Sequence, residues 1–280
     1  MGSGSKIDWT DDTWSPVSGC TPVSPGCDRC YASAIAHRFD GTAVWPYGFD
    51  VTLWPGRMEL PLRWRRPRLT FVCPTGDLFH HRVPDRFIAE VWAVMQRCPG
   101  HTFQVLTKRH ARMHALLSSD EFWSAVEKLS RQKWSSAGAG AQHPPEFGRV
   151  HRGLPNVWLG VSAEDQKWAD IRIPILMQTP AFVRWVSLEP LLGAVDASGY
   201  LTGPGALDWV VAGGESGSGA RMMELDWARG VSAQCASVGV AFFFKQTGSA
   251  LARELGCRGK GNDPAQWPEK FPRQYPSRVR

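Results

Sequence analysis

Short apolar runs recur along the chain, and most end in a polar or glycine cluster that leads into a helical pattern. Runs without strict polar alternation are typical of strands in a parallel sheet covered on both faces. The pattern predicts strands at residues 6–10, 69–73, 102–106, 157–161, 183–186, 209–212 and 240–244. Helical spacing of apolar positions predicts helices at residues 31–39, 84–97, 110–117, 120–131 and 226–238, with Asp120 and Asp226 as N-caps and Gly239 as a stop. Strands that alternate with helices indicate the α/β class.

Polar residues follow nearly every predicted strand, and their position distinguishes a barrel from an open doubly wound sheet. No nucleotide-binding G-x-G-x-x-G follows the first strand. In a (β/α) barrel the carboxyl ends of the strands converge on one face, where active sites are built. We therefore predict a (β/α) barrel or partial barrel of about six or seven mostly parallel strands. The polar residues at strand ends are Asp77, Lys108, Arg109, Ser162, Glu164, Ser187, Glu189, Glu215, Ser216, Lys245 and Gln246.

A chain of 280 residues with 43% hydrophobic content is long enough for one large core. We predict a single barrel domain over residues 6–248, with insertions at about 40–68 and 135–153 where Gly, Pro or Trp replace the helical period. Residues 1–5 have the composition of a flexible linker or tag. Residues 249–280, rich in Pro, Lys and Arg, are predicted to be a weakly structured extension.

The charge balance permits a polyanionic partner without requiring one. Lys and Arg number 32 against 26 Asp and Glu, a net charge of +6. Four arginines interleave with Trp64, a mixture that suits either phosphate and base contacts or a solvated loop. They are Arg63, Arg65, Arg66 and Arg68. The apolar runs are far too short to cross a bilayer and no secretory leader opens the chain, so we expect a cytoplasmic protein without a membrane partner.

The seven cysteines fall into two groups. An odd count without a leader argues against a disulfide framework, so reduced thiols are expected. Four cysteines stand singly and are interpreted as small core residues: Cys73, Cys98, Cys235 and Cys257. The others, Cys20, Cys27 and Cys30, form a C-x6-C-x2-C pattern in a loop rich in Pro and Gly, just before a predicted helix. Such a loop is stiff and allows thiolates to converge on one centre.

Three thiolates favour one kind of centre. A cubane [4Fe–4S] cluster held by three cysteines leaves one iron open to a small molecule, which in radical enzymes is S-adenosylmethionine (SAM). Structural zinc takes four ligands, and the C-x2-C pair with His37 or Cys73 as a further ligand is the second interpretation. The third is three thiols packed in a tight loop.

Several blocks resemble the bacteriophage-type three-cysteine-motif proteins, a family of unknown function distantly related to radical SAM enzymes. The similarity begins with K-I-D-W-T at residues 6–10, Trp14, the three cysteines and Tyr31. It continues with GDLF at 76–79, LTKR at 106–109, LGV at 159–161, SLEPLL at 187–192, GGESG at 213–217 and FKQ at 244–246. The usual radical SAM spacing is C-x3-C-x2-C, so the first spacer here is three residues longer, and Arg29 occupies the position of the usual aromatic.

The resemblance implies a SAM site at the strand ends. By analogy of position, Thr75, Gly76 and Asp77 would meet the amino group of the methionine moiety, where a carboxylate suits an ammonium. Lys108 or Arg109 would pair with its carboxylate.

The following strand ends would hold the rest of SAM. Ser162 and Glu164 would accept hydrogen bonds from the ribose hydroxyls. Gly213 and Gly214 would allow the backbone to approach the adenine or the substrate, with Glu215 as a polar anchor.

Glu189 and Lys245 are the candidates for substrate contact or proton transfer. The resulting hypothesis is a radical SAM enzyme that acts on a nucleobase or nucleic acid. The alternative is a zinc-stabilised module that binds nucleic acid or a protein partner without catalysis. A further alternative is a metal-dependent hydrolase that uses Asp77, His80 and Glu215.

Overall fold

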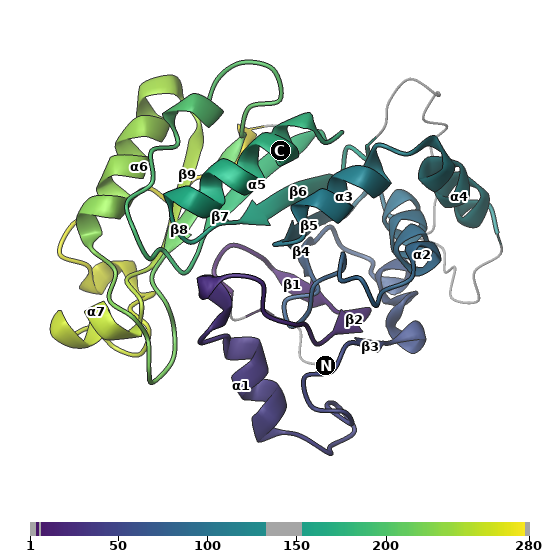
Figure 1. The fold of residues 1–280 in the computed structure, drawn as a ribbon, viewed down its shortest axis with the longest axis horizontal. Helices are drawn as coiled ribbons and strands as arrows, with labels where there is room; N and C mark the ends of the chain where they lie inside the picture. The colour runs from purple at the N-terminus through teal and green to yellow at the C-terminus, as the bar shows by residue number, and fades with distance from the viewer. Residues whose placement is uncertain (1–3, 6, 133–152, 278–280) are drawn as a thin grey trace. The chain divides into compact units, whose positions relative to one another are not determined.

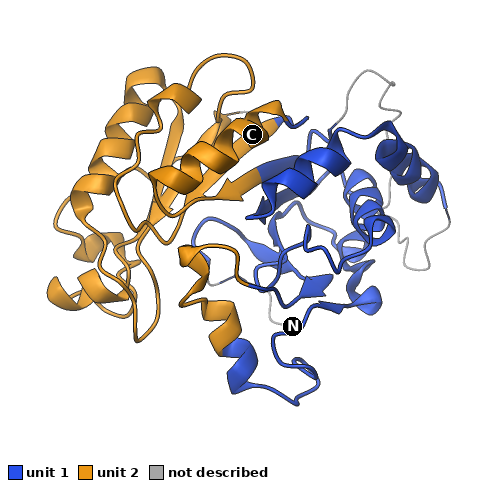
Figure 2. Ribbon diagram, in the orientation of Figure 1, with its two compact units in different colours: residues 1–21, 35–159, 179–182 blue, residues 22–34, 160–178, 183–280 orange. Residues whose placement is uncertain are grey.

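A computed structural model of the chain describes residues 4–5, 7–132 and 153–277. The chain divides into two compact units, each of which is described by itself (Figure 2). Unit 1 comprises residues 1–21, 35–159 and 179–182. Unit 2 comprises residues 22–34, 160–178 and 183–280. The predicted insertion at 135–153 lies outside the described residues except for Gly153, and so does most of the predicted linker.

Seven strands form the main sheet, in the order β1-β4-β5-β6-β7-β8-β9 (Figure 1). Their bounds are β1 Asp12–Trp14, β4 Leu69–Val72, β5 Thr102–Thr107, β6 Val157–Ser162, β7 Val183–Leu188, β8 Trp209–Gly213 and β9 Ala241–Gln246. The pairs β1–β4, β4–β5, β7–β8 and β8–β9 are parallel. The order follows the chain without the reversal of a doubly wound sheet. The predicted α/β fold, a partial (β/α) barrel, is confirmed.

Unit 1 packs helices against the first strands of the sheet. Its helices are α2 Asp85–Gln96, α3 His110–Leu117 and α4 Asp120–Ser130, and a small antiparallel sheet pairs β2 Val17–Ser18 with β3 Thr52–Leu53. Helix α2 buries Ile88, Val91 and Met95 on its apolar face. The N-cap of α4 is Ser119, whose hydroxyl accepts from the Phe122 N–H, so the predicted cap Asp120 stands in the first turn.

Unit 2 contains β7, β8 and β9 with helices α5 Gln166–Gln178, α6 Leu225–Val238 and α7 Ser249–Glu254. Helix α1, Tyr31–Arg38, begins in this unit. Helix α6 ends where Gly239 adopts φ +74°. Its N-cap is Glu224, and the predicted cap Asp226 lies one residue inside the helix. Helix α5 was not predicted, because Pro174 lies inside it and interrupts the expected pattern.

The first strand begins later in the chain than its hydropathy predicts. The predicted strand at residues 6–10 is not observed, and β1 begins at Asp12 instead. Carboxylates fix this register: Asp11 accepts from the Leu69 N–H, and Asp12 pairs with Arg68. The strand has one buried apolar residue, Trp14, which is 1% exposed, and the polar residues Asp12 and Thr13 before it give no strand signal in the sequence.

The segment after Gly248 is more ordered than its composition predicts. It forms α7 and then lies along the edge of β9, where the Phe244 N–H donates to the Pro272 carbonyl at 2.9 Å. Phe271 stacks on Phe244 with ring centroids 4.2 Å apart, and Trp267 meets the same ring edge-on. The aromatic residues, scattered without a period, cover an edge strand that would otherwise expose unpaired backbone groups.

The insertion at 40–68 has no α-helix, as expected, and contains β3 with two 3-10 turns, Pro55–Arg57 and Leu60–Arg63. Trp64 packs edge-on against His101, and the Arg68 guanidinium lies 4.9 Å from the Trp64 ring centroid. This tryptophan therefore serves packing within unit 1.

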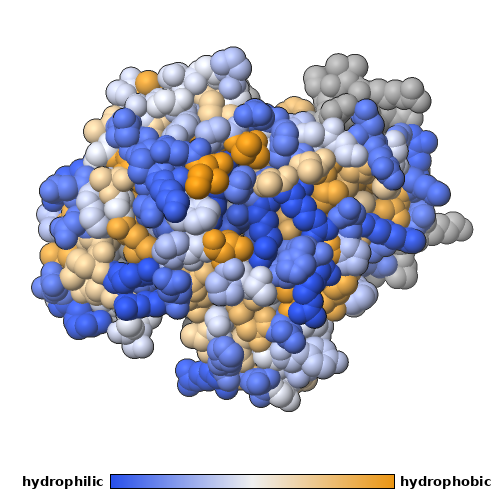
Figure 3. All heavy atoms as spheres, viewed as in Figure 1, coloured by the Kyte–Doolittle hydropathy of each residue, from blue (hydrophilic) through white to orange (hydrophobic). Residues whose placement is uncertain are grey.

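Hydrophilic side chains dominate the face drawn in Figure 3, and apolar residues appear there in small separate groups. In the part of the chain that the structure describes, no helix has both the length and the apolar character needed to cross a membrane.

Candidate functional site

Burial separates the cysteines into two chemical groups. Cys73, Cys98 and Cys235 are buried, and desolvation raises the pKa of each to about 12. The motif cysteines are half-buried and form no disulfide: Cys20, Cys27 and Cys30. Cys257 is also half-buried, and its thiol donates to the Gln266 carbonyl. The core cysteines are therefore poor metal ligands, whereas the motif thiols are accessible.

The motif loop passes from one unit to the other. Cys20 belongs to unit 1, and Cys27 and Cys30 belong to unit 2. Among the described residues, no three or more His, Cys, Asp and Glu side chains are gathered into a group that could hold a metal ion.

In unit 1, Asp77 connects the ends of β4 and β5. This carboxylate is 6% exposed and accepts from the Phe79 N–H at 2.9 Å and from the Thr107 hydroxyl at 2.7 Å. It also accepts from the Lys108 N–H at 3.2 Å, and the Arg109 Nε lies 3.9 Å away. Most hydrogen-bond acceptor sites of the Asp77 carboxylate are therefore occupied by groups in the chain's own loops.

Arg109 connects this carboxylate to the turn that carries Cys20. Its Nη2 donates to the Thr21 carbonyl at 3.0 Å and lies 3.8 Å from the Cys20 Sγ. A guanidinium at this distance favours a thiolate over a thiol. Arg109 was predicted to meet a carboxylate of SAM; the structure places it beside Asp77 and Cys20.

Glycines let the Cys20 turn approach the end of β4. Gly19 and Gly76 form a parallel bridge, and the Gly19 N–H donates to the Thr75 carbonyl at 2.9 Å. A Cβ on Gly76 would lie 3.1 Å from the Ser18 Cα, so a side chain there would separate the two segments. Thr75 and Gly76 thus face the chain that leads into the first motif cysteine.

His80 completes this cluster as a neutral imidazole. Its Nδ1 accepts from the Arg82 N–H, which leaves Nε2 to donate to the Thr21 hydroxyl at 2.9 Å. Burial, and after it the charge of Arg109, lowers the pKa of His80 to about 4. Both ring nitrogens are hydrogen-bonded to other residues of the chain, which argues against His80 as the metal ligand of a hydrolase.

The neutral His80 predicts a pH dependence of stability. Because the pKa is lowered on folding, the unfolded chain binds the proton more tightly, and stability present above pH 6.5 is lost as the pH falls toward 4. Urea unfolding of His80→Asn, which keeps an acceptor for the Arg82 N–H, should show a flatter pH profile over this range. The exposed His37→Asn is the control, and equal slopes in both variants would refute the assignment.

In unit 2, Glu164 at the end of β6 contacts the cysteine loop. Its Oε1 accepts from the Gly26 N–H at 3.0 Å, and its Oε2 accepts from the Arg172 Nη1 at 3.1 Å. Both charged side chains are fully buried. Burial lowers the pKa of Arg172, and the charges of Glu164 and Cys27 oppose this shift. The Arg172 guanidinium also lies 4.1 Å from the Trp168 ring centroid.

Glu215, after β8, holds a second arginine against the same loop. Its carboxylate accepts from the Arg221 Nε, Nη2 and backbone N–H at 2.5–2.9 Å. Burial tends to raise the pKa of Glu215, but these hydrogen bonds outweigh burial and lower it. The Arg221 Nη2 also donates to the Pro25 carbonyl at 2.9 Å, and its Nη1 lies 3.6 Å from Asp28.

Glu189 and Lys245 form an ion pair between the ends of β7 and β9. The Lys245 Nζ lies 2.7 Å from both carboxylate oxygens, and the Gln246 Nε2 lies 3.3 Å from one of them. The Ser162 hydroxyl donates to the Glu189 carbonyl at 3.2 Å. The two charged side chains are 12% and 18% exposed, so the pair remains within reach of a ligand.

Tyr31 connects this pair to the last motif cysteine. Although the residue as a whole is 45% exposed, desolvation of its hydroxyl end raises its pKa, and the charges of Cys30 and Glu189 add to the shift. The Tyr31 hydroxyl, at the start of α1, is therefore within electrostatic range of both a motif thiol and the Glu189 carboxylate.

Gly213 and Gly214 allow close approach of the backbone that follows β9. A Cβ on Gly214 would lie 2.2 Å from the Thr247 carbonyl oxygen, and one on Gly213 would lie 3.3 Å from Gln246. Their small size is therefore needed where the loop after β8 meets the loop after β9.

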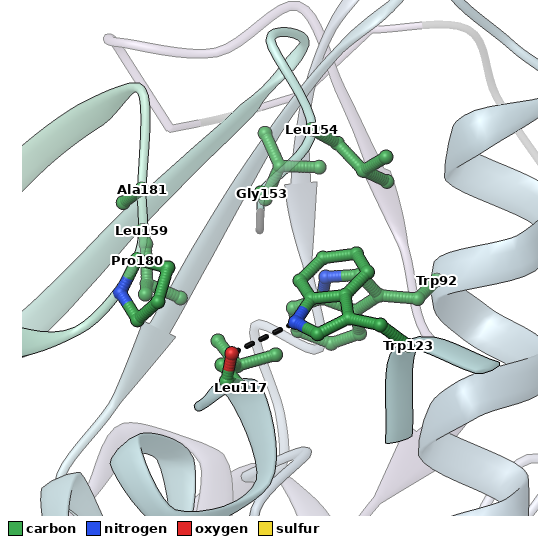
Figure 4. Close-up of a pocket in the computed structure, with 9 residues that line it drawn as sticks. Trp92, Leu117, Trp123, Gly153, Leu154, Leu159, Pro180 and Ala181 are labelled. Carbon is green, nitrogen blue, oxygen red and sulfur yellow. Dashed lines mark hydrogen bonds between the residues drawn. The ribbon is translucent and has the colours of Figure 1, made fainter. Parts of the chain in front are cut away.

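A pocket in unit 1 has none of these polar groups in its lining (Figure 4). It encloses about 210 Å³, open solvent included, at the amino end of β6. Trp92, Trp123 and Pro180 form much of its wall, and the Trp123 Nε1 donates to the Leu117 carbonyl at 2.8 Å. All nine lining residues are apolar or glycine, which does not suit a charged cofactor.

Three residues of these clusters were not predicted: Thr21, Arg172 and Arg221. An arginine among the apolar residues of α5 is a signal that sequence could have offered, since such a residue is buried only with a partner. The contact of Arg221 with Pro25 joins residues far apart in the chain and has no sequence signature.

The fold and the two clusters define an α/β partial-barrel protein with accessible thiols on one loop and charged groups at its strand ends. The chain belongs to the family described as "Protein of unknown function (DUF5131)", which matches residues 4–276. No curated protein and no solved structure matches the chain.

Proposed function

We propose that the chain is a radical SAM enzyme in which Cys20, Cys27 and Cys30 hold a [4Fe–4S] cluster. The observation that carries the proposal is the set of three half-buried cysteines within residues 20–30 that form no disulfide, distinct from the thiols buried in the core. When bound, such a cluster supplies the electron that splits SAM to a 5′-deoxyadenosyl radical. The partial barrel supports the resemblance to radical SAM enzymes.

The donor chemistry suits this centre. Thiolates are the usual ligands of iron–sulfur clusters, and Arg109 supplies a positive charge 3.8 Å from the Cys20 Sγ. The ligands of many metal sites become ordered only when metal binds, so the proposal does not require a preformed metal group in the metal-free chain.

The charged groups at the strand ends differ in what they offer a ligand. Glu189 and Lys245 combine opposite charges with partial exposure, which suits the ammonium and carboxylate of an amino acid or a proton-transfer role. Lys108 is half-buried, and its backbone N–H is bound to Asp77. A nucleobase or nucleic acid is the proposed substrate class, supported by the net charge of +6 and by exposed arginines such as Arg65 and Arg66.

One observation favours the zinc alternative. Cys27 and Cys30 lie together in unit 2, and the Cys30 N–H donates to the Cys27 carbonyl, a tight C-x2-C turn of the kind found in zinc knuckles. A zinc-stabilised module without catalysis predicts no turnover of SAM.

The proposal predicts that anaerobically reconstituted protein, given SAM and dithionite, forms 5′-deoxyadenosine. Cys30→Ala should form none above the background of SAM without protein, because a two-cysteine site no longer holds the cluster. Cys257→Ala is the matched control, since this thiol is half-buried but lies outside the motif. Chromatography of the product measures the outcome, and equal amounts from Cys30→Ala and the unmodified chain would contradict the proposal.

A further inference from the structure

The strand-end carboxylates of unit 2 point to a role other than ligand binding. We infer that Glu164 and Glu215, acting with Arg172 and Arg221, are positioning residues that anchor the turn carrying Cys27 to the carboxyl ends of β6 and β8. The inference depends on the proposed function only in taking the motif thiols as cluster ligands. The anchoring itself is a property of the metal-free chain.

The first anchor comes from β6. The Glu164 carboxylate accepts the Gly26 N–H at 3.0 Å and packs so closely that a Cβ on Gly26 would lie 3.0 Å from the Glu164 Cδ. The Arg172 Nη1 donates to the other oxygen of that carboxylate and also to the Ser162 carbonyl at 2.7 Å, which holds the carboxylate in place. The acceptor is thus rigid and fully buried.

The second anchor comes from β8 and is independent of the first. Arg221 is held by three hydrogen bonds to Glu215, which leaves its guanidinium directed at the loop. There it binds the Pro25 carbonyl at 2.9 Å and lies 3.6 Å from the Asp28 carboxylate. Contacts at Pro25, Gly26 and Asp28 therefore surround Cys27.

The anchored segment is a 3-10 turn, Pro25–Cys27, whose proline restricts the backbone further. Fixing both sides of Cys27 limits where its thiol can point. Charge-assisted hydrogen bonds of this kind commonly change a local equilibrium by about tenfold or more. Glu164 and Glu215 thus have their acceptors committed to the cysteine turn and to the arginines beside it, whereas those of Glu189 are occupied by Lys245 and Gln246.

Hydrogen exchange of the metal-free protein tests the inference, with mass spectrometry reporting on residues 22–34. Arg221→Ala should raise exchange there by about tenfold. Arg229→Ala is its control, because Arg229 has two acidic partners in the same unit, Asp226 and Glu269, and no contact with the loop. Arg221→Lys should restore part of the protection.

Gly26→Ala tests the other anchor without touching a charged residue. Its Cβ would press on Glu164, so exchange of residues 22–34 should rise, although alanine stiffens a free loop. Gly56→Ala is the control: Pro55–Arg57 is also a 3-10 turn that begins Pro-Gly, and a Cβ on Gly56 meets nothing within 4 Å. Hydrogen exchange in the turn Pro55–Arg57 should not rise in Gly56→Ala.

The possible outcomes distinguish the anchoring of the Cys27 turn from the proposed iron–sulfur function. Faster exchange in Arg221→Ala and Gly26→Ala but not in the controls, confined to residues 22–34 and accompanied by less iron taken up on reconstitution, supports positioning. Equal exchange in variants and controls overturns it. If exchange rises as expected but even the unmodified chain takes up no iron, the anchoring stands and the proposed function fails.

Discussion

Replacing Glu164 with leucine should lower the free energy of unfolding by about 3–5 kcal/mol, the usual consequence of leaving a buried charge without its partner. Arg172 is fully buried, and Glu164 is the carboxylate that pairs with it. The leucine would also remove the acceptor of the Gly26 N–H. Urea unfolding followed by circular dichroism measures the change.

The double variant Glu164→Leu/Arg172→Leu distinguishes an unpaired charge from lost packing. Removing both charges should recover part of the loss, because a buried ion pair is often replaced by apolar residues at little net cost. Glu164→Gln, whose amide oxygen can still accept from one of the two partners while its NH2 faces the other, should lie between the unmodified chain and Glu164→Leu. A double variant whose loss equals or exceeds the sum of the single losses would contradict this account.

Replacing Cys27 with serine should reduce bound iron from about four atoms per chain to background. Serine preserves size and polarity but is a poor ligand for an iron–sulfur cluster, so the loss reports on ligation rather than packing. The turn around Cys27 is held by contacts to its neighbours, and we expect the fold to survive. Cys98→Ser serves as a comparison, because Cys98 is a core thiol, 5% exposed, whose loss should affect stability and leave iron unchanged. Undiminished iron in Cys27→Ser would remove this cysteine from the centre.

Hydrophobic patterning was sufficient for most of the fold. Near-continuous apolar runs identified the six strands from β4 to β9, because strands covered on both faces carry that pattern wherever they occur. It failed at β1, where Trp14 is the one apolar residue after Asp12 and Thr13, and at α5, where Pro174 and a buried Arg172 interrupt the helical period. It also predicted too little order after Gly248, since Trp267 and Phe271 pack on Phe244 although the apolar residues there show no periodic spacing.

The candidate site was predictable only in part. Topology places polar residues at the carboxyl ends of parallel strands, and Glu164, Glu189 and Glu215 follow β6, β7 and β8 accordingly. What each carboxylate binds depends on contacts with residues distant in the chain. Sequence cannot show that Gly26 and Arg221 meet two of them while Lys245 meets the third. The roles inferred by analogy of position therefore stay predictions, and the anchoring roles required the structure.

The most direct test of the central claim is metal and sulfide analysis of the chain after anaerobic reconstitution with iron and sulfide. The account predicts a brown protein with about four iron and four sulfide per chain and broad absorption near 400 nm. A colourless protein that carries one zinc per chain and takes up no iron would contradict it.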